Sequence, residues 1–219
     1  MPPPAACLFD LDGLLLDTEP LHARAWRQAA QAFGTQLQER QLLQLRGRRR
    51  HDCADQVLAW IRADGHHCSS REELLAVRQP IAEHYLPLAA PMPGAETLVR
   101  RCQALAVPMA LATSSSRSAV ELKLAPHPWL ALIGTRVHGD DPGLRAGKPA
   151  PDVFLLAAER LGVDPRCCWA FEDSPAGAQA AAAAGCRVFV LRSEATTAAS
   201  FPTGAMLLDS LQQVQLGAG

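Results

Sequence analysis

Two carboxylates separated by one residue follow a short apolar run near the start of the chain. The run 6–9 ends at Asp10, and Asp12 is followed directly by Gly13. Such a run is typical of a buried strand, and the glycine indicates that the backbone turns sharply there. Two carboxylates at one strand end repel each other, so they need a cation, a proton or a chemical role. An Asp-x-Asp-Gly segment alone is more typical of a solvated turn, so its interpretation depends on the rest of the chain.

Three further polar sites follow apolar runs later in the sequence. If the strands are parallel, their carboxyl ends meet at one edge of the sheet, where ligands bind in open α/β sheets. Oxygen ligands without histidine or cysteine favour Mg²⁺. Hydroxyl, backbone and ammonium donors suit an anionic phosphoryl group, while one carboxylate can act as nucleophile and a second as acid and base. The three sites are Thr113 with Ser114, Lys148, and Glu172 with Asp173.

The segments that would position these groups alternate between strand and helix patterns. This alternation predicts an α/β fold, a doubly wound parallel sheet covered by helices on both faces. Asp209 is expected to cap a terminal helix. Strands are expected at 6–9, 107–112, 133–137, 167–171, 187–191 and 206–208, and helices at 95–105, 116–124, 152–161 and 175–185.

The block 17–88 shows only helical periodicity and is expected to be an inserted all-α cap domain. Residues 1–16 and 89–219 would then form the catalytic core, joined to the cap by the Pro-rich connector 87–94. Helices are expected over 20–33, 37–45, from Asp52 as cap to near Gly65, and over 71–86. Pro80 should kink or split the last of these helices.

Four segments resemble, in order and spacing, the motifs of the haloacid dehalogenase (HAD) superfamily. They are Asp10-Leu-Asp-Gly13, Thr113, Gly147-Lys-Pro-Ala-Pro-Asp152 and Phe171-Glu-Asp-Ser174. The insertion resembles that family's small helical cap, as in β-phosphoglucomutase and phosphoglycolate phosphatase. The resemblance covers essentially the whole chain and implies a HAD-like Rossmannoid core. Dehalogenating members lack the second Asp, so the presence of Asp12 implies phosphoryl chemistry.

The resemblance also implies a role for each motif residue. Asp10 would take the phosphoryl group as nucleophile, and Asp12 would transfer protons. Mg²⁺ would be the cofactor. The phosphoryl oxygens would be held by Thr113, Ser114 and Lys148, and the metal by Asp10, Asp12 through its backbone carbonyl, Asp173 and Glu172. Ser115 and Ser116 are expected to be only caps or turn residues.

Residues of the insertion are candidates for substrate contacts. In caps of this kind an arginine after a basic-Gly loop reaches the substrate, and Arg50 has that place here, with Arg46 as partner. A solvated basic face is the alternative for this arginine run. His22 and Thr18 lie where such caps face the site, although His22 would equally suit a surface position. Trp26 and Trp60 are expected in the core.

These observations predict a Mg²⁺-dependent phosphatase for a small phosphorylated metabolite, a sugar phosphate or phosphoglycolate-like ester, acting through an aspartyl-phosphate. A phosphosugar mutase of the β-phosphoglucomutase type is the alternative. Arg46, Arg50 and His22 favour the mutase, whereas Arg117 stands where a smaller polar residue would be expected. A phosphometabolite-binding module without turnover is the alternative from another class.

Composition excludes several other classes. The 21 basic and 22 acidic residues give a net charge of −1, which argues against nucleic-acid and membrane partners. Seven scattered cysteines without Cys-x-x-Cys spacing argue against zinc and disulfides. The N-terminus lacks the basic region of a signal peptide, so we expect a cytoplasmic protein. We expect a monomer, and the sequence leaves oligomers open.

Overall fold

Six parallel strands form one sheet in the order β3-β2-β1-β4-β5-β6 in the computed structural model, which describes residues 3–193 and 197–217. The expected strands are all present, each within two residues of its predicted start and one of its end. They are β1 (Ala6–Phe9), β2 (Met109–Ala112), β3 (Thr135–Val137), β4 (Cys168–Glu172), β5 (Arg187–Leu191) and β6 (Met206–Leu208). The doubly wound α/β prediction is therefore confirmed.

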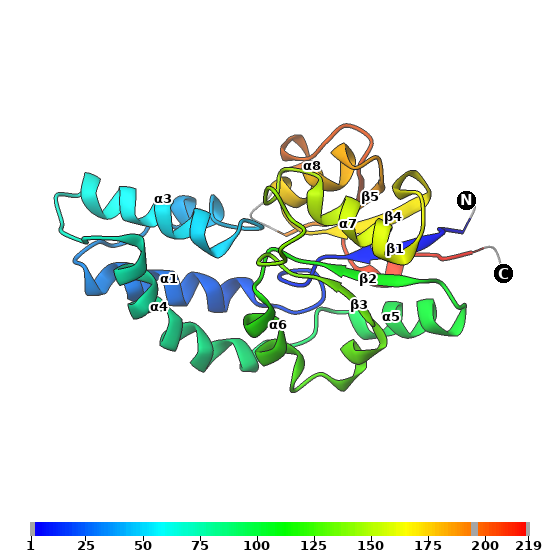
Figure 1. The fold of residues 1–219 in the computed structure, drawn as a ribbon, viewed down its shortest axis with the longest axis horizontal. Coiled ribbons are helices and arrows are strands. Elements are labelled where there is room, and N and C mark those ends of the chain that lie inside the picture. Colours follow the sequence, from blue (N-terminus) through cyan, green and yellow to red (C-terminus); the bar gives the residue numbers. More distant parts are fainter. Residues whose placement is uncertain (1–2, 194–196, 218–219) are drawn as a thin grey trace.

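Side chains on the central strands alternate between two apolar layers. Cys7 and Phe9 of β1 belong to the layer on one face of the sheet, and Ala6 and Leu8 belong to the layer on the other. Helix α5 (Ala95–Ala104) covers the first face, and α7 (Asp152–Leu161) and α8 (Pro175–Ala183) cover the second (Figure 1). Burial on both faces explains why these strands read as continuous apolar runs.

The register of the sheet aligns the ends of its central strands. Phe9 pairs with Leu111 of β2 on one side and with Phe171 of β4 on the other. The backbone N–H of Asp10 continues the ladder by donating to the Phe171 carbonyl at 3.0 Å. The residues that follow β1, β2 and β4 therefore emerge side by side at one edge.

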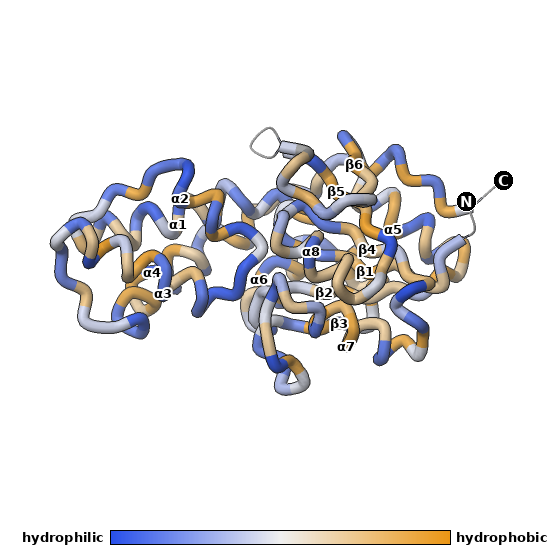
Figure 2. Tube along the Cα trace, turned by 90° about the horizontal axis from the view of Figure 1, so that it is seen from above, coloured by the Kyte–Doolittle hydropathy of each residue, from blue (hydrophilic) through white to orange (hydrophobic). Residues whose placement is uncertain are grey.

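The segment 17–88 forms a helical body beyond this edge, with its own apolar core (Figures 1 and 2). Its elements are α1 (Glu19–Ala32), α2 (Glu39–Leu43), α3 (Arg50–Ala63), α4 (Arg71–Tyr85) and the 3₁₀ turn η1 (Leu86–Leu88). Trp26 is buried in that core, as expected, and Trp60 packs against it partly buried. Among the described residues of this segment there is no strand.

Pro80 was expected to kink or split its helix. It does not split α4, which runs unbroken from Arg71 to Tyr85, because the Pro80 ring lies on an exposed position where the missing N–H costs little. Two other local expectations were wrong. Asp52 does not cap α3; the helix begins two residues earlier, and Asp52 lies in its first turn, where the helix dipole favours an acid. At the C-terminus a 3₁₀ turn, η5 (Leu211–Gln213), replaces the expected helix, and Ser210 rather than Asp209 caps it.

The expected start of α8 is confirmed at the level of single residues. Ser174 caps α8 by accepting a hydrogen bond from the Gly177 N–H, and Pro175 occupies the first turn. All seven cysteines are free thiols. Within the described parts of the chain, no helix combines the length and apolar character needed to cross a membrane.

Candidate active site

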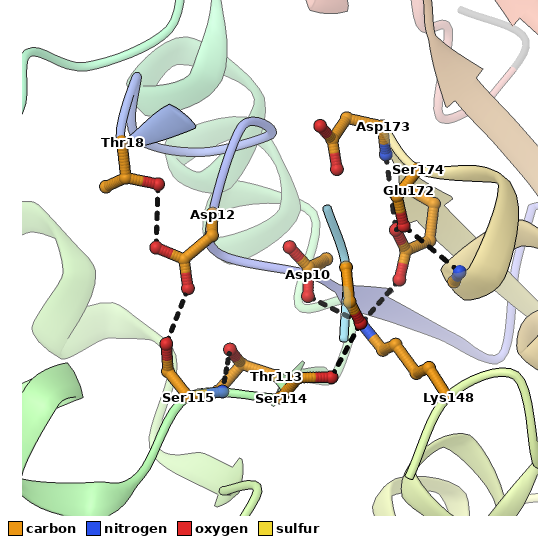
Figure 3. Close-up of polar contacts among 12 residues, drawn as sticks. Asp10, Asp12, Thr18, Thr113, Ser114, Ser115, Lys148, Glu172, Asp173 and Ser174 are labelled. Carbon is orange, nitrogen blue, oxygen red and sulfur yellow. Dashed lines mark hydrogen bonds and ion pairs between the residues drawn. The ribbon is translucent and has the colours of Figure 1, made fainter. Parts of the chain in front are cut away.

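A buried ammonium group joins two of the strand ends. Lys148 lies in the loop before α7, and its Nζ donates to Asp10 Oδ1 and to Glu172 Oε1, each at 2.5 Å (Figure 3). Burial lowers the pKa of Lys148, but the two carboxylates raise it more, so that the net shift is upward. Lys148 is therefore a fixed positive charge between the ends of β1 and β4.

Three acidic side chains lie together at this edge. Oxygen atoms of Asp10, Glu172 and Asp173 lie within 4.8 Å of one another, and all three residues are buried. The pKa of Asp173 is raised well above its usual range, first by burial and then by the neighbouring carboxylates. Among the described atoms, Asp173 Oδ2 has no hydrogen-bond donor, and its nearest cation, Arg46, is 3.8 Å away. Lys148 alone does not compensate this cluster.

The acidic cluster fits a hard divalent cation. Its donors are carboxylate oxygens only, which is the ligand set that Mg²⁺ prefers over zinc or copper. The unpartnered Asp173 Oδ2 is the specific sign, because a buried carboxylate oxygen without a partner is unfavourable. Asp10, Glu172 and Asp173 are thus the residues that could hold a metal.

Two glycines make room for this cluster. Gly13 has a φ of +81°, and a Cβ there would come within 2.3 Å of Asp173 Oδ2. A Cβ on Gly177, in the first turn of α8, would come within 2.0 Å of Glu172 Oε1. The turn after Asp12 and the start of α8 therefore need glycine, because any side chain would occupy the space of the acids.

Asp12 has surroundings quite different from those of Asp10. Its Oδ1 accepts from Thr18 Oγ1 at 2.7 Å and lies 3.2 Å from His22 Nε2, while its Oδ2 accepts from Ser115 Oγ at 2.7 Å (Figure 3). Lys123 Nζ lies 2.6 Å and 2.7 Å from the two oxygens. Burial would raise the pKa of Asp12, but Lys123 and His22 hold it well below its usual range.

The carboxyl group of Asp10 has a pKa near neutral pH. Burial raises its pKa to about 7, although Lys148 opposes the shift. The carboxylates of Glu172 and Asp12 add to the rise. A further cation beside Asp10 would favour its ionised, nucleophilic form.

Thr113 and Ser114 follow β2 and face the same region. Thr113 is 1% exposed, and its Oγ1 accepts from the Ser115 N–H at 3.1 Å. It is not the cap of α6 (Arg117–Leu124), because that helix begins after Ser116. Ser114 Oγ donates to the Gly47 carbonyl at 2.9 Å, so that this side chain also joins the core to the helical segment.

A cavity of about 530 Å³ separates the sheet edge from the helices of the segment 17–88. Arg46 and Arg50 both line it, but each already has a polar partner. Arg46 Nε donates to Glu19 at 2.8 Å and Nη1 to Ser193 at 3.1 Å, and Arg50 Nη1 donates to Gln79 at 2.9 Å. The residues that face this space with predicted roles are Asp10, Asp12, His22, Arg46, Arg50, Thr113 and Ser114.

The structure brings all eleven predicted site residues to this region. Thr18 does not line the cavity; it is fully buried, and its hydroxyl reaches the site through the hydrogen bond to Asp12. Lys148, Glu172 and Asp173 lie beneath the cavity, where they contact one another and Asp10.

Several residues of the site were missed. Lys123 and Ser115 contact Asp12, so Ser115 is more than the turn residue that was expected. Arg78 lines the cavity, stacks on Trp26 at 4.2 Å and lies 3.1 Å from His22 Nδ1. A sequence signal existed for both cations: Lys123 shares a helix face with Val120, and Arg78 shares one with Leu74 and Ala82.

Comparison with known proteins agrees with this arrangement. Residues 4–185 match the haloacid dehalogenase-like hydrolase family. A probable pseudouridine-5'-phosphatase of Drosophila melanogaster is 39% identical over 189 residues, 84% of this chain and 80% of that protein. The fructose-1-phosphate phosphatase YqaB of Escherichia coli (strain K12) is 37% identical over 182 residues, 83% of this chain and 93% of that protein.

A solved structure shares the whole architecture. CbbY of Rhodobacter sphaeroides, in complex with phosphate, superposes with a TM-score of 0.81 at 26% identity, covering 96% of each chain. The family match spans the helical segment and strands β1 to β4, and it includes every acidic residue of the cluster. The chain belongs to the haloacid dehalogenase-like hydrolase family.

Proposed function

We propose that this protein is a Mg²⁺-dependent phosphatase that hydrolyses a small phosphate ester through an aspartyl-phosphate on Asp10. The observation that carries the proposal is the pairing of two differently held carboxylates at one cavity. Asp10 lies among acids beside Lys148, whereas Asp12 is held by Lys123 and two hydroxyls. Two such carboxylates suit two roles, nucleophile and proton carrier.

In the first half of the reaction, an oxygen of Asp10 attacks phosphorus and the bond from phosphorus to the ester oxygen breaks. Lys148 and Thr113, with the backbone around Ser114, provide cationic and polar groups near the negative charge of the transferred group. Asp12 gives its proton to the leaving oxygen, so that an alcohol departs. Because Lys123 and His22 keep the pKa of Asp12 low, its proton comes with the substrate: the monoanion of the phosphate ester passes its phosphoryl proton to Asp12 before this step.

In the second half, water attacks the phosphorus of the aspartyl-phosphate and the bond to the Asp10 oxygen breaks. Asp12 takes one proton of that water and returns to its protonated form, while the Asp10 carboxylate is restored and inorganic phosphate leaves. Mg²⁺ bound by Asp10, Asp173 and Glu172, with the Asp12 carbonyl, would neutralise the phosphoryl oxygens during both halves. The residues themselves fix the positions of the nucleophile and the proton carrier.

The helical segment 17–88, which we propose to be a cap domain, would select the substrate. The relatives are named for pseudouridine 5'-phosphate and fructose 1-phosphate, both phosphorylated sugars or nucleosides. The cavity is lined by Arg46, Arg50 and Arg78 as well as by Asp10 and Asp12. These donors suit a hydroxylated or anionic substrate body, and we propose a sugar phosphate or a related small ester.

A phosphate-release screen tests this function. Sugar phosphates, nucleotides and short phospho-acids are incubated with wild-type protein and with the Asp10→Asn variant, each with and without Mg²⁺. The proposal expects Mg²⁺-dependent release by the wild-type protein and none by the folded variant. Release by the variant at the wild-type rate would contradict it.

A phosphosugar mutase is the second candidate, and one observation favours it. His22 lies 3.2 Å from Asp12 at the cavity wall, where a sugar hydroxyl could replace the attacking water. The same screen separates the two functions. Conversion of β-glucose 1-phosphate to glucose 6-phosphate without free phosphate would support the mutase and exclude the phosphatase.

A further inference from the structure

Lys123 carries a buried ammonium group that the proposed reaction steps have not used. The residue is 0% exposed, although it lies on α6, a helix whose neighbouring positions Arg117 and Ser118 face solvent. Buried lysines are rare because removing an ammonium group from water is costly. Its surroundings must therefore compensate the charge.

All three N–H directions of Lys123 are used within the site. Nζ lies 2.6 Å from Asp12 Oδ1, 2.7 Å from Asp12 Oδ2 and 2.8 Å from Ser115 Oγ. Ser115 Oγ in turn donates to Asp12 Oδ2 at 2.7 Å. Lysine, hydroxyl and carboxylate thus form a closed ring of contacts.

Lys123 has more contacts in this group than the other partners of Asp12. Thr18 and His22 hold Oδ1, and Ser115 holds Oδ2. Among the contacts of the described residues, Lys123 is the partner that reaches both oxygens and also the Ser115 hydroxyl that donates to Oδ2. It therefore fixes the carboxylate and the Ser115 hydroxyl in place relative to each other.

We propose that Lys123 is a positioning residue that holds the Asp12 carboxylate in the orientation needed to deliver a proton to the leaving oxygen. The inference rests on the proposed function, because it takes Asp12 as the proton carrier. Lys123 acts through Asp12 and Ser115, and it is not itself one of the residues that line the cavity. Proton transfer depends on placing donor and acceptor within hydrogen-bond reach, so a carboxylate that shifts from this place loses much of this advantage.

The basicity of the leaving group separates positioning from simple structural support. Phenyl phosphate releases a more basic oxygen than p-nitrophenyl phosphate and needs the proton more. The ratio kcat/KM reports the steps up to loss of the leaving group, so it measures the acid step apart from the later attack of water. Damage to the fold alone would lower kcat/KM for both substrates by the same factor.

The test compares wild type with Lys123→Met, which removes the ammonium group but keeps the length of the side chain. We expect kcat/KM to fall about 100-fold for phenyl phosphate and less than about 10-fold for p-nitrophenyl phosphate. Val120→Ala is the matched control on the same buried face of α6. It should lower the Tm and leave the ratio between the two substrates unchanged.

A double-mutant cycle identifies Asp12 as the residue through which Lys123 acts. In the Asp12→Asn background, Lys123→Met should change kcat/KM for phenyl phosphate by less than about 3-fold, because the partner is already lost. Equal losses on both substrates, or a full loss in the Asn background, would overturn the inference. If Asp12→Asn keeps wild-type activity, the proposed function itself fails; if it is inactive while Lys123→Met is normal, only this inference fails.

A second variant keeps the test decisive if Lys123→Met does not fold. Ser115→Ala removes the hydroxyl that completes the ring and leaves the ammonium group in place. It should show the same selective loss on phenyl phosphate, at about 10-fold. An unchanged ratio between the two substrates in a folded Ser115→Ala protein would overturn the inference.

Discussion

Asp10 and Asp12 are separated by a single residue, yet the structure gives their carboxylates opposite electrostatic surroundings. Burial raises the pKa of Asp10 to about 7, whereas Lys123 and His22, against the effect of burial, hold the pKa of Asp12 well below its usual range. The difference arises from their partners: Asp10 shares one lysine with Glu172, and Asp12 has Lys123 with three further donors. The same short turn thus supplies two carboxylates with different proton affinities.

The raised pKa of Asp10 has a consequence for the stability of the metal-free protein. Between pH 4 and about 7 the folded state binds the Asp10 proton more tightly than the unfolded state, so this group's contribution falls as pH rises through that window. Asp10→Asn removes the ionisable group, and with it the stability that the folded protein loses when Asp10 ionises. In chelator, the variant should exceed wild type in free energy of unfolding by about 1–4 kcal/mol at pH 7.5.

Urea denaturation at pH 5.0 and 7.5 measures this difference. The advantage of Asp10→Asn should shrink at the lower pH, where wild-type Asp10 is already protonated. Asp12 acts in the opposite direction, because its depressed pKa stabilises the fold above pH 4 and this contribution is lost only in stronger acid. A variant less stable than wild type at pH 7.5 would contradict the description of Asp10.

Gly13 and Gly65 form a matched pair for testing the space around the acidic cluster. Both have a φ of +81°, so alanine at either position meets the same backbone strain of about 1 kcal/mol. A Cβ on Gly13 would also come within 2.3 Å of Asp173 Oδ2, whereas a Cβ on Gly65 would meet no atom within 4 Å. Gly13→Ala should lower kcat at least about 10-fold, while Gly65→Ala should keep it.

Thermal unfolding and steady-state kinetics on both variants measure these outcomes. Gly65→Ala should lose only the stability that backbone strain costs and keep its kcat, whereas Gly13→Ala, with the added overlap with Asp173, should lose more stability and far more kcat. Equal kcat values for Gly13→Ala and Gly65→Ala would show that the position of Asp173 does not matter to turnover.

Asp173 should dominate the response of the protein to Mg²⁺. Because Asp173 Oδ2 has no hydrogen-bond partner among the described residues, a cation is the partner that it lacks. Mg²⁺ at 100 times its Kd should stabilise the wild-type protein by about 2.7 kcal/mol and should stabilise Asp173→Asn much less. The exposed Asp64, at the end of α3, gives the control Asp64→Asn.

Differential scanning fluorimetry with and without Mg²⁺ makes this comparison without any substrate. Wild type and Asp64→Asn should show the same rise in Tm. A rise of equal size in Asp173→Asn would place the metal elsewhere.

Arg50 should affect substrate binding more than chemistry. It lines the cavity and is oriented by Gln79, away from the contacts of Asp10. Arg50→Ala should raise KM about 10-fold or more on the natural ester, with a smaller change in kcat, since a charge-assisted hydrogen bond contributes roughly 1.5–3 kcal/mol. Arg71, half-buried, paired with Asp55 and not among the residues that line the cavity, is the control for the loss of an arginine from the segment 17–88.

Full saturation curves for both arginine variants distinguish these effects. Arg71→Ala should match the wild-type KM. A loss confined to kcat in Arg50→Ala would assign that arginine to the reacting end of the site instead of the substrate body.

Local patterns in the sequence predicted the strands and the polar residues that end them. Asp10, Thr113 and Glu172 each follow an apolar run, and the parallel register then brings them to one edge. Ser174 with Pro175 predicted the start of α8 for the same reason, because capping depends on neighbours in sequence. Each of these features depends on residues that are close together in the sequence, so the sequence alone predicts it.

The partners of Asp12 and the course of α4 at Pro80 could not be predicted in this way, because they depend on packing between distant parts of the chain. Lys123 is 111 residues from Asp12 in sequence, and only the packing of α6 against the core brings them together. Pro80 was expected to kink or split α4, yet the helix continues through it, because the opposite face packs on the apolar core of the segment 17–88. The position of Lys123 on the apolar face of its helix, beside Val120, was the feature of the sequence that could have predicted its burial.

Identification of the phosphorylated residue tests the central claim most directly. Wild-type protein with Mg²⁺ and p-nitrophenyl phosphate is quenched in acid within one turnover, digested at low pH and analysed by mass spectrometry. We predict one phosphoryl group on Asp10, absent from the Asp10→Asn protein. A phosphoryl group on another residue such as His22, or turnover by Asp10→Asn, would contradict the account.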